Sequence, residues 1–268
     1  MLAQINNISL AFNDQGTGLP LVFLHAFPLN RSMWESQERA LSSQFRVITV
    51  DLRGHGESDA PLWHYSLDQA ADDVCNLLDH LSIRHAVFIG LSMGGYIALA
   101  FYRKYAERVR GLVLADTRPQ ADTADGKRAR FEMAQMAYKQ GACAIADTMI
   151  PKLLSPTTIQ TRPDLVQRVR TMIEGNQVSG IAGDLMAMAE RPDSISLLQQ
   201  IICPTQVIVG ELDVPTPPSD ARLMAERIPN ARLTIIPGAG HLSNLEQPEL
   251  FNETIRSFGS TLTRSTVG

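Results

Sequence analysis

Short apolar runs that alternate with helical segments constrain the fold of this chain more than any other feature. Val, Ile, Leu and Phe dominate the runs with little polar alternation, as strands covered on both faces of a parallel sheet require. The runs lie at residues 20–25, 45–51, 86–91, 109–115, 205–209 and 231–236. Helical patterns occupy residues 67–81, 93–105, 219–228 and 245–258. This alternation predicts an α/β fold with a doubly wound, mostly parallel sheet.

Two segments depart from this alternation. Residues 2–12 contain alternating stretches, and the turn-like residues 13–16 after them predict an opening antiparallel strand or hairpin. Residues 118–199 are rich in Ala, Met, Gln and Arg and offer no clear strand, and their best helical patterns lie around 130–137 and 165–173. So long a patterned stretch is not a loop. We therefore expect a helical cap inserted into a core of residues 1–117 and 200–268.

Composition and charge argue against several classes of protein. A net charge of −4 gives no basic surface for nucleic acid or an anionic membrane. No apolar run reaches the roughly 20 residues of a membrane span, and residues 1–10 lack a signal-peptide pattern. The separated cysteines Cys75, Cys143 and Cys203 predict small buried thiols in a reducing compartment. We expect a cytoplasmic protein without metal or cofactor, whose oligomeric state, a homo-oligomer included, stays open.

The sharpest local signal is the sequence GLSMGG at residues 90–95, which lies between a predicted strand and a predicted helix. A tight turn of this kind exposes its serine at the carboxyl end of a strand, where open α/β sheets bind ligands. The glycines two residues to either side of Ser92 let the chain segments approach closely. The following helix N-terminus favours negative charge. Ser92 is therefore the predicted nucleophile.

A serine hydroxyl is a poor nucleophile until a base accepts its proton, and the chain has 6 histidines for that role. His241 follows Gly-Ala-Gly after the last predicted strand, on a loop that can reach the same sheet edge as Ser92. We therefore predict His241 as the base. Four other histidines suit other roles. His25 suits a hydrogen-bonded loop anchor, and His80 and His85 suit the surface. His64 lies in a Trp-His-Tyr loop and stays ambiguous.

The base in turn needs an acid that fixes its tautomer and stabilises its cationic form. Asp213 follows the predicted strand at residues 205–209 and lies one strand before His241, on a loop at the same sheet edge. The resulting chain order of nucleophile, acid and base is the one expected behind a nucleophile elbow. We predict Asp213 as the acid. Its rivals are Glu211, Glu246 and, most seriously, Asp116, because a carboxylate one strand earlier could also reach the histidine.

The oxyanion that forms during acyl transfer needs preorganised N–H donors. One donor is predicted at Met93, directly after the nucleophile. The other is expected in the loop that follows the strand at residues 20–25, where we choose the N–H of Phe27. Pro28 beside it has no N–H and makes the loop rigid. The side chain of Phe27 would then line the acyl pocket.

The predicted substrate pocket combines core residues with cap residues. Its core members are Phe27, Trp34, Met93 and Leu242, with Met133, Met136 or Met186 of the cap above them. Methionines adapt to irregular shapes, although ordinary cap packing explains each of them equally well. Because no lysine or arginine is plainly aimed at the acyl group, we expect a small to medium, largely apolar substrate. The cap arginines that could still reach in are Arg118, Arg128 and Arg130.

Four segments together resemble the α/β-hydrolase superfamily, specifically its esterase, lactonase and cofactor-free haloperoxidase-like branch. They are FLHAFP at 23–28 with Trp34, DLRGHGES at 51–58, GLSMGG at 90–95 and GAGH at 238–241. The resemblance spans residues from about 20 to 117 and from about 200 to 258, and the stretch between them matches nothing familiar. Ala26 departs from the family, which usually has glycine after the first histidine.

The resemblance implies roles that the residues alone leave open. It implies that residues 51–58 form a structural loop beside the site, with Arg53 and His55 in its hydrogen-bonding framework. A serine at the elbow implies an acyl-enzyme and hydrolysis of a small-molecule carboxylic ester, thioester or lactone, with no cofactor. Carbon–carbon bond hydrolases or lyases use the same residue types, and a non-catalytic receptor can share the fold, so both remain as alternatives.

Overall fold

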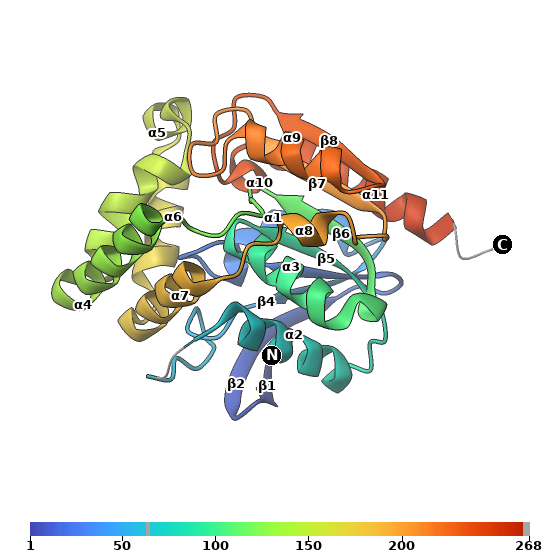
Figure 1. Ribbon diagram of the computed structural model, residues 1–268, viewed down its shortest axis with the longest axis horizontal. Coiled ribbons are helices and arrows are strands. Elements are labelled where there is room, and N and C mark those ends of the chain that lie inside the picture. Colours follow the sequence, from blue (N-terminus) through green and yellow to red (C-terminus); the bar gives the residue numbers. More distant parts are fainter. Residues whose placement is uncertain (63–64, 265–268) are drawn as a thin grey trace.

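The computed structural model describes residues 1–62 and 65–264, and an 8-stranded sheet runs through its centre (Figure 1). The strand order is β1-β2-β4-β3-β5-β6-β7-β8. All pairs from β4 to β8 in that order are parallel, and β2 is antiparallel to both of its neighbours. This confirms the predicted α/β fold. The strands are β1 Leu2–Ile5, β2 Ile8–Gln15, β3 Pro20–Leu24, β4 Arg46–Val50, β5 Ala86–Leu91, β6 Val109–Ala115, β7 Thr205–Gly210 and β8 Ala231–Ile236.

The opening hairpin turns earlier than the sequence suggested. Asn6 and Asn7 both have left-handed backbones, with φ of 49° and 64°, and they join β1 to β2. The expected turn at residues 13–16 is wrong, because β2 continues to Gln15 and pairs with β4 there. The backbone leaves the strand only at Gly16, where φ is 80°.

Helices join the strands on both sides of the sheet. The expected helices at residues 67–81 and 93–105 agree closely with α2 and α3. The helix expected at residues 245–258 is divided in two, because Pro248 begins a new helix after α10. The helices outside the segment between β6 and β7 are η1 Arg31–Trp34, α1 Glu35–Leu41, α2 Leu67–His80, α3 Met93–Tyr105, η2 Ala106–Arg108, α9 Pro218–Arg227, α10 Ser243–Glu246 and α11 Pro248–Arg264.

Two contacts show that the sheet is covered on both faces. Phe88 of β5 lies against Phe101 of α3, with ring centroids 4.1 Å apart. On β6, a Cβ placed on Gly111 would lie 2.9 Å from the side chain of Leu262 in α11. Phe88 pairs with Leu112, the residue after Gly111, so the two contacts fall on opposite faces. The near-continuous apolar strands are therefore buried from both sides.

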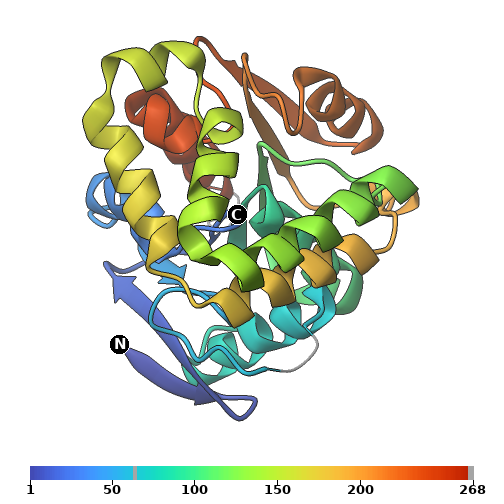
Figure 2. The same cartoon turned by 90° about the vertical axis from the view of Figure 1, so that its left-hand side faces the viewer.

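In the segment between β6 and β7, the helices α4 to α7 gather at one side of the sheet, and the short α8 lies apart from them (Figure 1). Figure 2 shows α4 and α7 side by side, and the two pack closely. Gly141, with a φ of 80°, breaks α4 in the middle. The helical patterns expected around residues 130–137 and 165–173 fall inside α4 and α6. The helices are α4 Ala124–Leu153, α5 Pro156–Thr161, α6 Pro163–Glu174, α7 Val178–Glu190 and α8 Ile195–Leu198.

These helices touch the core through close backbone contacts. A Cβ on Gly180 of α7 would lie only 1.8 Å from the carbonyl oxygen of Gly54. The Asn176 side chain joins the same two parts, because its Nδ2 donates to Pro28 O over 2.7 Å and its Oδ1 accepts from Gly56 N over 2.7 Å. The loop that carries Phe27 is thereby linked to the inserted helices.

The cysteines follow the sequence expectation only in part. Cys75 and Cys203 are buried free thiols, but Cys143 is exposed, so the expectation of a buried thiol is wrong for Cys143. It lies just after the break at Gly141, on the outer side of α4. Within residues 1–62 and 65–264, none of the helices is long and apolar enough to cross a membrane.

Candidate active site

Ser92 occupies the tight turn between β5 and α3, with φ of 55° and ψ of −113°. A non-glycine residue rarely adopts such a backbone, and such strain concentrates at functional sites. The Ser92 N–H donates to Ala115 O of the neighbouring strand over 2.9 Å, which holds the turn on the sheet. A Cβ on Gly90 would lie 2.2 Å from Gly94 O, and one on Gly94 would lie 2.1 Å from Leu24 O. Only glycine fits at either position.

The structure brings Ser92, His241 and Asp213 into one hydrogen-bonded array. The Ser92 Oγ lies 2.8 Å from His241 Nε2, and His241 Nδ1 lies 2.9 Å from each oxygen of Asp213. Asp213 and His241 are buried, whereas Ser92 is partly exposed. This geometry is the one that proton transfer from Ser92 to His241 requires, with Asp213 in the place of a carboxylate that orients the imidazole.

Two neighbouring loops bring the acid and the base together. Asp213 follows β7 and His241 follows β8, and these strands pair in parallel, so both loops leave the same sheet edge. The Leu212 N–H donates to Ala239 O over 2.8 Å, which ties one loop to the other. A Cβ on Gly210 would lie 2.0 Å from the carbonyl oxygen of Gly240. This close packing places the two side chains in contact.

Thr216 belongs to the site, although the sequence reasoning missed it. Its hydroxyl donates to Asp213 Oδ2 over 2.7 Å, and its backbone N–H donates to Asp213 Oδ1 over 3.0 Å. The signal in the sequence was a threonine three residues after an aspartate, a spacing at which side chain and backbone often bond locally. Such a spacing is common in turns and would not have singled out Thr216 without the fold.

The carboxylates that the sequence offered as alternatives to Asp213 accept hydrogen bonds from groups other than His241. Asp116 accepts from Gly210 N over 2.7 Å and from the Ser243 hydroxyl, so it braces the loops around the site. Burial raises the pKa of the Asp116 carboxyl well above its ordinary value, and the nearby charge of Asp213 raises it further. Glu246 accepts from Gly240 N over 2.7 Å, and Glu211 accepts from Gly238 N over 2.9 Å.

His25 and His55 are buried beside the loop of Phe27. His25 Nε2 accepts from Leu52 N over 3.0 Å, which is the bonding expected of a loop anchor. Burial lowers the pKa of His25 to about 4, partly offset by its hydrogen bond to Ala26 O. His55 Nδ1 lies 3.2 Å from Asp184 Oδ2 of α7. Burial, followed by the proximity of His25, lowers the pKa of His55 to about 3.

Where the structure describes them, the other arginine and histidines considered from the sequence form no hydrogen bond with Ser92, His241 or Asp213. Arg53 forms a buried ion pair with Asp73, at 2.8 Å from Nε to Oδ2, as a framework residue of its loop would. His80 and His85 are exposed, as expected. His64 lies outside the described residues. In the described part of the chain, no group of three or more His, Cys, Asp or Glu side chains could hold a metal ion.

Met93 directly follows Ser92, and Phe27 lies in the loop that follows β3. Met93 is the first residue of α3, where a backbone N–H has no partner within the helix. The loop of Phe27 is held against this helix start, because a Cβ on Gly94 would lie 3.0 Å from His25 O as well as close to Leu24 O. Among the described residues, the Phe27 N–H makes no hydrogen bond.

The predicted pocket residues separate into two groups. Phe27 and Met133 line a cavity of about 200 Å³ between the core and the inserted helices. Trp34 is instead fully buried in the core, with its ring 5.0 Å from that of Phe23. The other pocket candidates lie outside this lining: Met93 and Leu242 are fully buried, and Met136 and Met186 pack half-buried against the core.

Arg118 and Arg130 also line this cavity, whereas the third arginine that the sequence left open does not. Arg128 is largely exposed and pairs with the exposed Asp125 on the same helix. The cavity contains apolar side chains as well, so a bound molecule would meet both an apolar and a cationic wall. The full lining is Phe27, Arg118, Asp122, Gly126, Ala129, Arg130, Met133, Met149 and Leu185.

Fold and site together define a class of protein: a mostly parallel sheet whose strand-to-helix elbow presents a serine to a histidine and an aspartate. A family model described as the alpha/beta hydrolase fold matches residues 20–248. The chain belongs to the α/β-hydrolase family, which confirms the resemblance stated from the sequence.

Relatives of known name cover nearly the whole chain. The 3-oxoadipate enol-lactonase 2 of Acinetobacter baylyi is 34% identical over 257 residues, which are 96% of this chain and 94% of the relative. A thermophilic esterase from Thermogutta terrifontis has a TM-score of 0.95 and 41% identity over 98% of both chains. The enol-lactonase from Burkholderia xenovorans LB400 has a TM-score of 0.91 and 30% identity, over 97% of this chain and 100% of that one. These names support the expectation of a carboxylic ester hydrolase.

Proposed function

We propose that this carboxylic ester hydrolase cleaves esters or lactones of small molecules through an acyl-enzyme on Ser92. The observation that carries the proposal is the hydrogen-bonded path from Ser92 Oγ to His241 over 2.8 Å and from His241 to Asp213 over 2.9 Å. Relatives named esterase and enol-lactonase support an ester or a lactone as the bond that is cleaved. A thioester would follow the same chemistry.

Acylation begins when His241 Nε2 accepts the Ser92 proton and Ser92 Oγ forms a bond to the substrate carbonyl carbon. The tetrahedral intermediate breaks its bond to the leaving oxygen, which receives the proton from His241 and departs as an alcohol. With a lactone, that alcohol stays attached to the acyl group. Water then attacks the acyl-enzyme while His241 accepts one of its protons. That proton returns to Ser92 Oγ as the carboxylic acid leaves.

The N–H groups of Phe27 and Met93 are proposed to hold the oxyanion of both tetrahedral intermediates. Support comes from the close approach of Gly94 in α3 to the backbone of Leu24 and His25, just before Phe27, and from the position of Met93 at the start of α3. Removal of one such donor typically costs about 2.7–4 kcal/mol of transition-state stabilisation. Both donors are backbone N–H groups, so no substitution other than proline removes either of them directly.

We propose that residues 118–199 act as a cap over this site on a core of residues 1–117 and 200–268. The close approach of Gly180 to Gly54 and the bonds of Asn176 to the loop after Phe27 support this assignment. The cavity lined by Phe27 and Met133 lies between the two parts and fits a small to medium acyl group. Its apolar side chains favour an acyl group that is apolar next to the carbonyl.

A fluorophosphonate label and a panel of substrates test the proposal. The wild type should be labelled once and should hydrolyse p-nitrophenyl butanoate or a simple lactone, and Ser92→Ala should lose both properties while its thermal unfolding stays cooperative. Ser243→Ala offers a control, because Ser243 bonds to Asp116 and not to His241. Labelling or turnover that survives in Ser92→Ala would overturn the assignment.

The same panel separates the alternative functions. Turnover of a diketone with no turnover of esters or lactones would identify a carbon–carbon bond hydrolase or lyase on the same residues. A wild type that is neither labelled nor active would behave as a non-catalytic receptor. A cytoplasmic location stays a prediction from the sequence, which leaves the oligomeric state open.

A further inference from the structure

We infer that Arg118 and Arg130 form a cationic wall of the acyl cavity and select substrates whose acyl chain ends in a carboxylate. The inference rests on the proposed function, because it names the substrate class of the same site. It also changes the expectation from the sequence, which favoured an uncharged substrate because no arginine was plainly aimed at the acyl group.

The first support is the arrangement of three arginines around one buried carboxylate. Asp122 is 1% exposed, and its oxygens accept from Arg118 Nη2 over 3.0 Å, from Arg191 Nη2 over 2.8 Å and from Arg130 Nε. Burial opposes the charge of Asp122, but the hydrogen bonds of Arg130 and Arg191 prevail and lower its pKa to about 2. Asp122 is therefore ionised and holds the three cations in fixed positions.

The second support is the charge balance of this cluster. Asp122 neutralises only one of the three arginines that bond to it. Burial opposes the charge of Arg118, but Tyr96, Asp122 and Asp220 outweigh it and raise the pKa of Arg118. Asp220 also accepts a hydrogen bond from Gln120 over 3.0 Å, and with it two carboxylates face three guanidinium groups. A cation excess beside a partly desolvated cavity attracts an anionic ligand.

Accessible donors are the third support. The side chains of Arg118 and Arg130 are 31% and 20% exposed, so each is held yet reachable from the cavity that they line. A guanidinium has five N–H donors, and the bond to Asp122 uses one of those on each side chain. The donors that remain match the planar, paired oxygens of a carboxylate.

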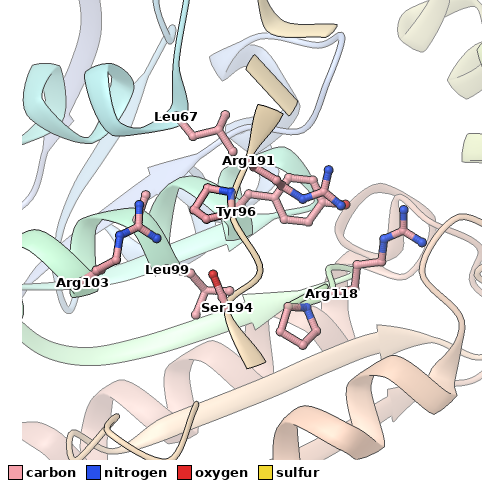
Figure 3. Close-up of a pocket in the computed structure, with 10 residues that line it drawn as sticks. Leu67, Tyr96, Leu99, Arg103, Arg118, Arg191 and Ser194 are labelled. Atoms are coloured by element: carbon pink, nitrogen blue, oxygen red, sulfur yellow. The ribbon is translucent and has the colours of Figure 1, made fainter. Parts of the chain in front are cut away.

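Arg191 and Arg118 reach the cluster from opposite ends of the inserted segment. Figure 3 shows Arg191 against the ring of Tyr96 and the guanidinium of Arg118 close to the hydroxyl of that ring, while Arg103 lies apart. The Arg191 Cζ is 4.2 Å from the Tyr96 ring centroid, which fixes the cation by stacking. Arg191 is nearly buried, so it serves to hold Asp122, and the exposed donors belong to the other two arginines.

The position of Arg118 links the cationic wall to the reacting centre. Thr117, the residue before it, donates its hydroxyl to the carbonyl oxygen of Ser92 over 2.8 Å. Phe27, whose N–H is the proposed oxyanion donor, lines the same cavity as Arg118 and Arg130. An acyl chain held beside Phe27 would share this cavity with the apolar side chain of Met133 and with both arginines.

The test compares p-nitrophenyl hydrogen adipate with p-nitrophenyl hexanoate, which have the same acyl length but differ in a terminal carboxylate. The measured quantity is the ratio of kcat/KM for the anionic ester to kcat/KM for the neutral one, after the uncatalysed rates are subtracted. We expect Arg130→Met to lower this ratio about tenfold or more, as loss of a charge-assisted hydrogen bond does. Arg130→Lys should retain most of the wild-type ratio, and added salt should lower the ratio in the wild type.

Arg128→Met is the matched control, because Arg128 lies on the same helix but is largely exposed and pairs with Asp125. The ratio of kcat/KM for the anionic ester to kcat/KM for the neutral ester should be the same in Arg128→Met as in the wild type. An unchanged ratio in Arg130→Met, in a protein that still unfolds cooperatively, would mean that the arginines only join the ends of the cap, and the inference would fail. If the wild type hydrolyses neither ester, the proposed function itself is wrong.

Discussion

The hydroxyl of Thr216 donates to Asp213 Oδ2 over 2.7 Å and lies 3.3 Å from His241 Nδ1. The backbone N–H of Thr216 donates to the other oxygen of Asp213 over 3.0 Å. Each carboxylate oxygen therefore has a second donor besides the imidazole. A buried carboxylate needs such partners, because an unsatisfied charged group is costly there. Under the proposed function, Thr216 is accordingly a positioning residue, which acts on His241 through Asp213.

Thr216→Val should reduce kcat by about 10- to 100-fold, because it removes a hydrogen bond to a charged group, a contribution of about 1.5–3 kcal/mol, while the backbone donor remains. KM for p-nitrophenyl butanoate should change little, since Thr216 does not line the substrate cavity. Thr216→Ser keeps the hydroxyl and should recover most of kcat. A valine variant that keeps the wild-type kcat, beside a serine variant that loses it, would show that the methyl packing matters and the hydroxyl does not.

Asp213→Asn and Asp116→Asn separate the acid from its strongest rival. The first change should lower kcat by about 10⁴-fold, because an amide opposite His241 Nδ1 favours the wrong tautomer. The second should lower kcat by less than about tenfold, since Asp116 bonds to Gly210 N and Ser243 and not to the imidazole. Steady-state kinetics on one neutral ester decide between them. A larger loss in Asp116→Asn than in Asp213→Asn would exchange the two roles.

The features of this molecule that the sequence predicts correctly are those that depend on short-range patterns. The strands β5, β6 and β8 begin and end where the apolar runs do. For β5 the reason is that a strand buried along its whole length has no polar position to blur its limits. The elbow at Ser92 could be recognised because its glycines are required by contacts within one turn and one neighbouring strand. Once these strands were placed, their order along the chain predicted the edge where His241 would lie.

The parts that could not be predicted depend on how the inserted helices meet the core. Gly141 breaks α4, so the apolar phase before the break does not continue after it. Cys143 lies just after the break and is exposed, whereas the general preference of cysteine for buried positions predicted a buried thiol. The cluster around Asp122 joins residues from both ends of the insertion, which no local pattern brings together. The same holds for Trp34, because only the packed α11 reveals that its ring lies 6.0 Å from Phe251 in the core.

Gly94→Ala should destabilise the protein strongly, although alanine normally favours a helix by about 1 kcal/mol over glycine. Its Cβ would lie 2.1 Å from Leu24 O, a backbone atom of a central strand that cannot yield. We expect a loss of about 1–3 kcal/mol or more in the free energy of unfolding, measured in urea, with loss of activity. Gly126→Ala is the control on another helix, because the nearest atom there is the Asp122 Cβ at 3.3 Å. Similar stabilities of the two variants would contradict the steric argument.

His25 makes the protein sensitive to acid, and the sign follows from its hydrogen bonds. His25 Nε2 accepts from Leu52 N, and Nδ1 donates to Ala26 O, so the buried imidazole is neutral. Burial lowers its pKa to about 4 from the ordinary value of 6.5. Between these two values the unfolded chain binds a proton that the folded protein does not. The free energy of unfolding contributed by His25 is therefore present above pH 6.5 and decreases as the pH falls towards 4.

His25→Gln should weaken this dependence, because its amide oxygen can accept from Leu52 N but does not take up a proton in the unfolded chain. For the wild type we expect the His25 contribution to fall by about 2 kcal/mol between pH 7 and pH 5. Urea unfolding at both pH values measures it as the difference between the wild type and His25→Gln. The exposed His85 provides the control, and His85→Gln should keep the wild-type loss on acidification. A His25→Gln protein that loses as much stability as the wild type over this range would show that His25 does not carry the effect.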